Sequence, residues 1–255
     1  MEKSQSQHNT TKKELKGTNL VIIITVIVSL LGAYFVGSKI SSFKFSSKFT
    51  SSLNSEESVV VPDFEPTQSV TLAVVTGEDH IYGDEFAPIA IVEYSDLECS
   101  FCGTYNNTIK EFVDKNEGKV MWVYRHFPIE NLHQNARLAA EATECAYSIG
   151  GEDVFWKMLA SIHESADEEG NIEKEKLPEI AKNLNIHIGD FEECLDTKKF
   201  ELKVESIFNT GLVAGVESVP TTFVMHMETG ALIPIEGSIS DKVLQAAVNE
   251  MMSYK

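Results

Sequence analysis

Positively charged residues are scarce in this sequence. Its 255 residues include 21 Lys and Arg against 39 Asp and Glu, which gives a formal net charge of -18 at pH 7. Residues 1–58 carry seven Lys and four Glu, so the rest of the chain holds 14 Lys and Arg against 35 Asp and Glu. A body this acidic repels phosphate backbones. We therefore expect no nucleic acid among its partners.

Glycine-rich phosphate loops and clustered metal ligands are also missing. No glycine-rich loop follows a predicted strand, which argues against a nucleotide site. Only four cysteines are present, and of these only Cys99 and Cys102 lie close together. Zinc needs about four ligands, and Cys145 and Cys194 are isolated in helical sequence. Half of a zinc site is thus the weaker interpretation of the Cys-x-x-Cys pair, and we predict no metal.

The N-terminal part contains one long stretch without charge. Residues 19–37 include no Asp, Glu, Lys or Arg. About 20 apolar residues span the hydrocarbon core of a bilayer, so this stretch predicts a transmembrane helix in contact with lipid. A buried core helix would have a polar face, and this stretch has none. No A-x-A-like cleavage site follows, which favours an uncleaved signal-anchor over a cleaved signal peptide.

These features divide the chain into four parts. Residues 1–18 form a short polar tail, residues 19–37 the predicted anchor, and residues 38–66 a Ser-rich flexible linker. Residues 67–255 are long enough for one α/β domain with a sizeable core.

Within this domain the hydrophobic pattern changes between strand and helix. Short apolar runs predict strands at 70–75, 89–94, 119–126, 221–226 and 231–235. Apolar residues three or four apart predict helices at 101–116, 134–149, 154–165, 174–184, 197–212 and 239–252. Residues 79–83 are predicted as a turn-rich lead, and Gly189-Asp190 as a break between helices. Because only helices are predicted from about 132 to 213, we expect a helical insertion there.

The cysteine pair lies at the start of the first predicted helix. The apolar run 89–94 ends at the turn-forming Ser95-Asp96, and Cys99 follows just before the helical pattern begins. Unpaired N–H groups and the positive end of the helix dipole favour a thiolate at that place. A thiolate is the nucleophile in disulfide exchange. Cys99 is therefore the predicted nucleophile and Cys102 the resolving thiol, with Asp96 and Glu98 expected to raise the pKa of Cys99.

Three segments, in this order, carry a family resemblance: Glu93–Cys102, Arg125–Pro128 and Gly215–Val224. With the helical insertion between the last two, they resemble the DsbA-like thiol-disulfide oxidoreductases of the thioredoxin-like superfamily, from about Asp79 to the C-terminus. The resemblance implies a thioredoxin-like α/β fold. It also implies that Val219 precedes a cis-proline, Pro220, beside the cysteine pair, where its backbone binds a substrate peptide; an ordinary trans turn before a strand is the alternative.

Further expectations concern Glu93 and the remaining cysteines. The resemblance places an acid at Glu93 beneath the disulfide, where it could shuttle the proton of Cys102; an exposed residue on an edge strand is the alternative. Four cysteines allow three pairings. Only the pairing of Cys99 with Cys102 and of Cys145 with Cys194 leaves the first pair free to cycle, and it makes Cys145–Cys194 a structural disulfide. Two buried free thiols are the alternative. His126 is expected to be structural or solvated, with a catalytic role as the alternative, and Trp122 and Trp156 are expected to belong to the core.

The combined prediction is a membrane-anchored oxidoreductase that forms disulfides in secreted or envelope proteins. An oxidised pair persists outside the cytosol, so we expect a cytoplasmic tail and a catalytic domain on the extracytoplasmic, periplasmic side. Its partners would be unfolded or reduced polypeptides and a membrane redox partner that reoxidises the pair. No cofactor is expected beyond the redox-active disulfide Cys99–Cys102. A reductase or isomerase of the same fold and a non-catalytic peptide-binding module remain alternatives.

Overall fold

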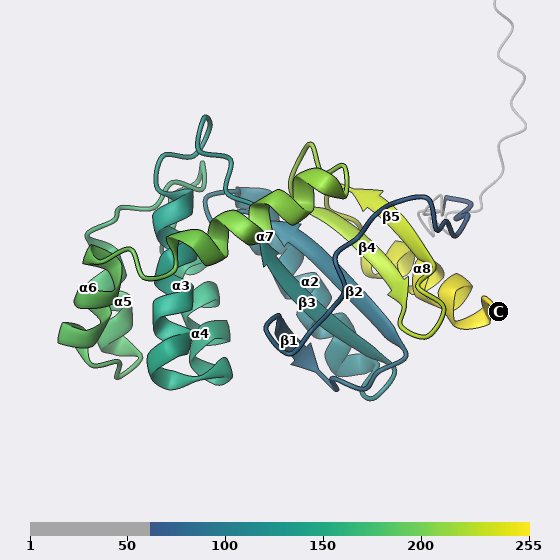
Figure 1. The fold of residues 1–255 in the computed structure, drawn as a ribbon, viewed down its shortest axis with the longest axis horizontal. Helices are drawn as coiled ribbons and strands as arrows, with labels where there is room; N and C mark the ends of the chain where they lie inside the picture. Colours follow the sequence, from purple (N-terminus) through teal and green to yellow (C-terminus); the bar gives the residue numbers. More distant parts are fainter. Residues whose placement is uncertain (1–61) are drawn as a thin grey trace, which may run out of the picture. The chain divides into compact units, whose positions relative to one another are not determined.

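A computed structural model describes residues 62–255. The predicted tail, the anchor at 19–37 and most of the linker lie outside the described residues. Among residues 62–255, no helix is both long and apolar enough to cross a bilayer. In chain order the elements are β1 (His80–Gly83), β2 (Ile89–Ser95), α2 (Ser100–Lys115), β3 (Val120–His126), α3 (Ala136–Gly150), α4 (Glu152–Ser165), α5 (Lys176–Asn183), α6 (Ile188–Asp196), α7 (Glu201–Val213), β4 (Thr221–His226), β5 (Leu232–Glu236) and α8 (Asp241–Ser253) (Figure 1).

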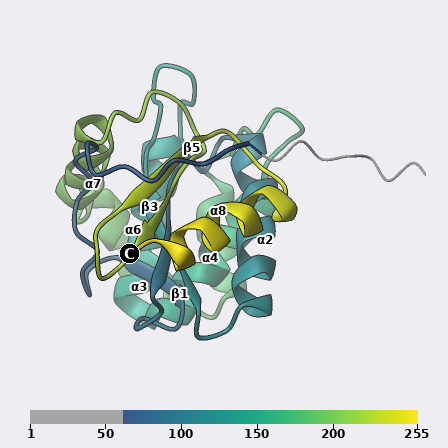
Figure 2. The same cartoon turned by 90° about the vertical axis from the view of Figure 1, so that its right-hand side faces the viewer.

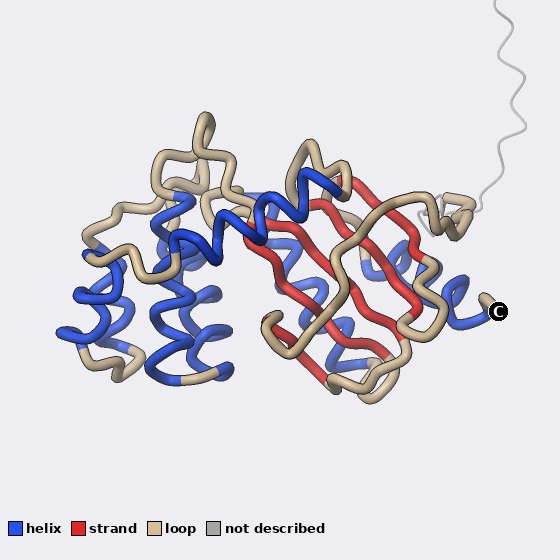
Figure 3. Tube along the Cα trace, viewed as in Figure 1, coloured by secondary structure: helices blue, strands red, loops and turns tan. Residues whose placement is uncertain are grey.

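The strands form one sheet in the order β1-β3-β2-β4-β5 (Figure 3). β2 and β3 are parallel and joined through α2, whereas β1, β4 and β5 run antiparallel to their neighbours. Helices α2 and α8 lie on one face and α7 lies on the other (Figure 2). Every residue of β2 and β3 is consequently buried, which explains why both strands have continuous apolar runs instead of alternating ones. The predicted thioredoxin-like α/β fold is confirmed.

Helices α3 to α6 of the insertion pack beside the sheet as their own group, whereas α7 lies across its face (Figure 1). Helix α3 packs against both α4 and α6, and a Cys145–Cys194 disulfide links α3 to α6 across 49 residues of sequence. The cysteines, together with the apolar faces of these helices, belong to the same buried cluster as one side of the sheet. The insertion and the sheet therefore share one core.

The predicted strand at 70–75 is wrong, and the first strand is β1, in the segment predicted as a turn. Residues 70–75 have no strand assignment and pair with no strand. The guanidinium of Arg125 supplies donors there, with Nη1 3.0 Å from the Ala73 carbonyl oxygen and Nη2 3.2 Å from that of Val74. An apolar run predicts extended backbone, but it does not identify the group that satisfies its carbonyls.

The predicted helix break at Gly189-Asp190 is also wrong, because both residues lie in the first turn of α6. His187 caps this helix by accepting a hydrogen bond from the Asp190 N–H at 3.4 Å. An aspartate in a first turn is favourable because of the helix dipole. The chain instead changes direction at Lys198, whose φ is 50°, so the predicted helix 197–212 begins later, as α7.

Candidate active site

Cys99 is the N-cap residue of α2. Its backbone is extended, and its sulfur accepts a hydrogen bond from the Cys102 N–H at 3.3 Å. The strand β2, buried at the centre of the sheet, ends at Ser95 and delivers the chain to this helix start. Cys99 is 7% exposed and Cys102 is fully buried. Both are free thiols in this structure, and of the two only Cys99 has surface that a second molecule can reach.

The two thiols have very different acidities. A hydrogen bond from the Cys102 thiol stabilises the Cys99 thiolate and, with the Cys102 backbone N–H, lowers the pKa of Cys99 to about 7 despite its burial. Burial and the neighbouring Cys99 raise the pKa of Cys102 far above its usual range. At neutral pH this arrangement favours a thiolate on Cys99 and a protonated Cys102.

The neighbouring carboxylates have structural roles. Asp96 does raise the pKa of Cys99 through its charge, but its carboxylate also accepts hydrogen bonds from the Ile129 N–H at 2.7 Å and from His133 Nδ1 at 2.8 Å. Glu98 accepts hydrogen bonds from the backbone N–H groups of Asn135 at 2.7 Å and Ile172 at 2.9 Å. Glu98 therefore connects the start of α2 to the residue before α3 and to the segment after α4.

The Val219–Pro220 loop lies opposite Cys99. The peptide bond between these residues is cis, and the Cys99 thiol lies 3.9 Å from the Val219 carbonyl oxygen. Strand β4 begins directly after the loop at Thr221 and pairs with β2. The sheet thus brings together two segments that are 120 residues apart in the sequence.

Glu93 lies in the middle of β2, flanked by β3 on one side and β4 on the other. The alternative of an edge position is therefore wrong, and the side chain is 0% exposed. The indole Nε1 of Trp122 donates a hydrogen bond of 2.9 Å to its carboxylate. Burial nevertheless raises the pKa of Glu93 to about 8. Such a carboxyl group can release or accept a proton near neutral pH.

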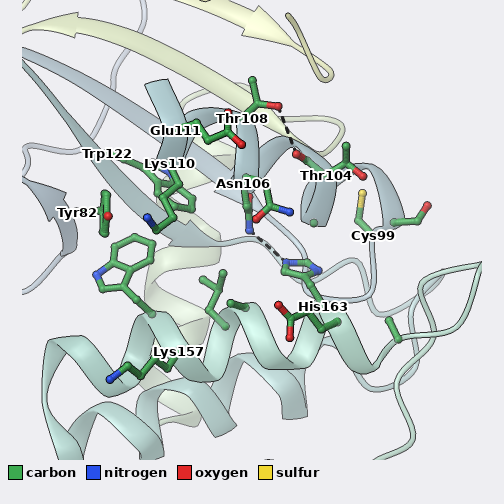
Figure 4. Close-up of a pocket in the computed structure, with 18 of the residues that line it drawn as sticks. Tyr82, Cys99, Thr104, Asn106, Thr108, Lys110, Glu111, Trp122, Lys157 and His163 are labelled. Carbon is green, nitrogen blue, oxygen red and sulfur yellow. Dashed lines mark hydrogen bonds between the residues drawn. The ribbon is translucent and has the colours of Figure 1, made fainter. Parts of the chain in front are cut away.

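A groove of about 1000 Å³ runs between α2 and α4 and begins at Cys99 (Figure 4). Trp122, Asn106 and His163 line it, together with Trp156. Trp122 is a core residue as expected, but its bond to Glu93 was not anticipated. Asn106 could have been noticed, since it follows Cys102 by four residues on an otherwise apolar helix face. His163 has no signal in the sequence.

Two other predictions concern residues near the site. His126 is fully buried, 3.2 Å from the Thr143 hydroxyl and 3.5 Å from the Glu144 carboxylate, so its role is structural. Cys145 and Cys194 are bonded to each other and are unavailable as zinc ligands. Residues 62–255 contain no group of His, Cys, Asp and Glu side chains arranged to hold a metal ion.

Comparisons with known proteins agree with this geometry. Residues 75–250 match the family model described as thioredoxin. The crystal structure of Pseudomonas aeruginosa DsbA2 is similar with a TM-score of 0.59 and 26% identity, covering 68% of this chain and 94% of that one. Oxidised BdbD from Bacillus subtilis has a TM-score of 0.61 at 20% identity, covering 72% of this chain and 99% of that one, which shows a shared fold.

Curated relatives are longer proteins. The Na⁺/H⁺ antiporter NhaA 1 of Salinispora arenicola is 30% identical over 172 residues, which are 67% of this chain and 24% of that protein. The antiporter NhaA 3 of Salinispora tropica is 30% identical over 146 residues, covering 57% of this chain and 21% of that protein. The chain therefore spans about a quarter of the length of the curated relatives it matches.

Proposed function

The chain belongs to the thioredoxin family and has the DsbA-like form of its fold, and on this basis we propose that it is a thiol-disulfide oxidoreductase acting on other polypeptides. Cys99 is the nucleophile and Cys102 the resolving thiol. The observation that carries the proposal is the N-cap position of Cys99, where a pKa of about 7 contrasts with the raised pKa of Cys102. Two thiols this unequal can divide the roles of attack and resolution without a cofactor other than their own disulfide.

Disulfide formation in a substrate proceeds in two exchanges. A substrate thiolate attacks Cys99 of the oxidised pair, so that a substrate–Cys99 bond forms, the Cys99–Cys102 bond breaks, and Cys102 leaves as a thiolate. Glu93, with a pKa of about 8, supplies the proton that Cys102 then takes up. A second substrate thiolate attacks the substrate sulfur of the mixed disulfide and displaces the Cys99 thiolate. The substrate loses two electrons and the cysteine pair gains them.

Substrate binding takes place beside Cys99, along the Val219–Pro220 loop. The position of the Val219 carbonyl, 3.9 Å from the Cys99 thiol, supports this assignment. An extended peptide can pair with such a backbone as an added strand, with little dependence on its sequence. Phe101 lies between the two cysteines and is 71% exposed, which offers an apolar contact to an unfolded chain.

Membrane attachment is part of the proposal. Residues 19–37 are uncharged and long enough to span a bilayer, and residues 38–66 would connect this anchor to a catalytic domain on the extracytoplasmic side. A membrane redox partner then reoxidises Cys99 and Cys102 after each turnover, because the pair is otherwise used once. This topology keeps the pair in a compartment where disulfides persist.

A reductase or isomerase is the second candidate, and one observation favours it. The negative charge of Asp96 raises the pKa of Cys99, and no histidine lies between the cysteines. A less stabilised thiolate makes the disulfide a weaker oxidant. Trapping the thiols of intact cells with an alkylating agent separates the two directions: a mostly oxidised pair supports the oxidase, and a mostly reduced pair supports the reductase or isomerase.

Activity is tested by refolding of a reduced, unfolded protein and by insulin reduction. We expect Cys99→Ser to abolish both reactions. Cys102→Ser cannot form the Cys99–Cys102 disulfide that refolding needs, and in insulin reduction its Cys99 thiolate should stop at a mixed disulfide with insulin. Cys145→Ala together with Cys194→Ala is the matched control, since it removes the other two sulfurs. If the intact protein catalyses neither reaction, a non-catalytic peptide-binding module replaces the proposed enzyme.

A further inference from the structure

The Asn106 side chain lies under the cysteine pair, one turn after Cys102 on the buried face of α2. One end of its amide lies 2.9 and 3.1 Å from the two Glu93 carboxylate oxygens and 3.0 Å from the Cys102 carbonyl oxygen. The other end lies 3.2 Å from Nε2 of His163. Since an amide donates through nitrogen and accepts through oxygen, one orientation fits all these contacts. The nitrogen points to Glu93 and Cys102, and the oxygen points to His163.

This orientation determines the hydrogen on His163. Because the Asn106 oxygen is an acceptor, Nε2 of His163 must carry the hydrogen that it donates. Burial lowers the pKa of His163 to about 4, so the ring is neutral at physiological pH. Figure 4 shows His163 reaching from α4 to Asn106 on α2. The contact crosses from the helical insertion to the helix that carries the cysteines.

Gly103 leaves room for the imidazole ring directly after the Cys-x-x-Cys pair. A Cβ atom at this position would lie 2.9 Å from Nδ1 of His163, closer than such atoms approach in proteins, and 3.0 Å from Cγ, which is also unusually tight. Glycine in a helix interior is unfavourable by itself. Here it allows the ring to lie against the backbone of α2, within reach of Asn106.

We propose that His163 is a positioning residue for the redox chemistry: its donation to Asn106 holds the amide in the orientation that donates to Glu93. Glu93 is thereby kept in place to exchange a proton with Cys102. The inference rests on the proposed function, in which Glu93 serves Cys102. It adds a contribution from the helical insertion, made through a residue 57 positions after Asn106.

The contact between His163 and Asn106 stabilises the ionised form of Glu93. Trp122 and Asn106 both donate to the carboxylate and favour its charge, while burial opposes it. When one donor turns away, the charged form is less stable and the pKa of Glu93 rises. The titratable groups around Glu93 are Cys99 at the N-cap of α2, Cys102 and Tyr105 on α2, Tyr124 on β3 and, through Asn106, His163 on α4.

The assignment of a measured titration follows from these neighbours. Burial raises the pKa values of Cys102, Tyr105 and Tyr124, and that of His163 is lowered to about 4. Between about pH 6 and pH 9, Cys99 and Glu93 therefore titrate without interference from the others. Two steps are expected in this range, and Glu93→Gln identifies the second by removing it.

The experiment uses the reduced full-length protein without substrate. The alkylation rate of Cys99 by iodoacetamide and the infrared carbonyl band of the protonated Glu93 carboxyl are each followed against pH. We expect His163→Leu to raise the pKa of Glu93 by about one unit, because the charged carboxylate loses a hydrogen bond from Asn106. His163→Gln retains an N–H donor and is expected to restore most of the wild-type position.

Either of two results overturns the inference. In the first, Glu93 titrates at the same pH in His163→Leu as in the wild type. In the second, His163→Leu and His163→Gln shift the Glu93 titration by the same amount. Gly103→Ala is a second variant, because it keeps the histidine but displaces its ring. A folded Gly103→Ala protein with an unchanged Glu93 step likewise overturns it. These titrations need no substrate, so they stand apart from the proposed function, which fails if Cys99→Ser retains exchange activity.

Discussion

Trp122 donates a hydrogen bond of 2.9 Å from its indole nitrogen to the carboxylate of Glu93, from one buried strand to the next. Burial raises the pKa of Glu93 to about 8, against a usual value of 4.5. The neutral Trp122 N–H limits this rise in pKa without adding a second buried charge. The same pair of residues therefore links the proton chemistry of the site to the stability of the sheet.

Glu93→Gln is expected to change how stability depends on pH. The folded state holds the Glu93 proton up to about pH 8, whereas the unfolded chain loses it near pH 4.5. The contribution of Glu93 to the free energy of unfolding is therefore fully present below pH 4.5 and is lost as pH rises through 8. Relative to the wild type, the variant should gain stability over this range, by a few kcal/mol at pH 8. Urea unfolding at pH 4.5 and pH 8 measures the difference, and equal pH profiles would contradict it.

Trp122→Phe is expected to raise the pKa of Glu93 by about one unit, because it removes the donor and keeps most of the aromatic packing. The pH dependence of Cys99 alkylation and the carboxyl infrared band measure this shift. Trp156→Phe is the matched control: this tryptophan also lines the groove, but its indole nitrogen donates to Glu152 at 2.9 Å. A shift of the same size in both variants would show that aromatic packing, and not the bond to Glu93, sets the pKa.

Lys203→Met is expected to destabilise the protein by about 3 kcal/mol, since it leaves a buried carboxylate with less compensation. Lys203 Nζ lies 2.7 Å from Glu144, whose side chain is fully buried. Burial opposes the charge of Glu144, yet hydrogen bonds with His126 and His80 keep its pKa below the usual range. The stability that ionised Glu144 contributes to the folded protein is present above pH 4.5 and is lost as pH falls through the lower folded-state pKa.

The double variant Glu144→Gln, Lys203→Met tests this assignment. It removes both charges, so we expect it to be more stable than Lys203→Met alone and to lose part of the acid sensitivity of the wild type. Thermal unfolding between pH 3 and pH 7 gives the comparison. Additive losses in the double variant would mean that the two side chains do not interact.

Removing the Cys145–Cys194 disulfide is expected to lower stability by up to about 4 kcal/mol, the loop-entropy estimate for a link across 49 residues. The measurement is denaturant unfolding of Cys145→Ala, Cys194→Ala with Cys99 and Cys102 intact. Thiol exchange at 25 °C should be retained, because the link joins α3 and α6, whereas Cys99 and Cys102 lie at the start of α2. Loss of exchange in a folded double variant would give the disulfide a role at the site.

The local pattern predicted much of this structure. Apolar runs located β2 through β5 because most residues of each strand are buried, and helical spacing located α2 through α5, α7 and α8 to within a few residues. The pattern failed at β1, an edge strand of four residues, and at α6, whose first turn contains residues typical of loops. Short elements on the periphery depend on their partners more than on their own sequence.

The candidate site divides in the same way. Cys99 at a helix start follows from a strand, a turn and a helical spacing that are all local. The contact between Asn106 and His163 joins α2 to α4, and its geometry depends on Gly103 and on how the two helices pack. No local pattern contains that information, so His163 was not found. Trp122 was assigned correctly to the core, but the hydrogen bond from its indole nitrogen to Glu93 was not predicted.

Glu98 has a consequence for protein engineering. Its two carboxylate oxygens accept the backbone N–H groups of Asn135 and Ile172, one before α3 and one after α4. Gly170, two residues before Ile172, lies so near that an added Cβ would come within 2.3 Å of the Glu98 carbonyl oxygen. A chimera that exchanges the insertion with that of another protein must therefore carry residue 98 and the glycine together, or the graft will disturb the cysteine loop it adjoins.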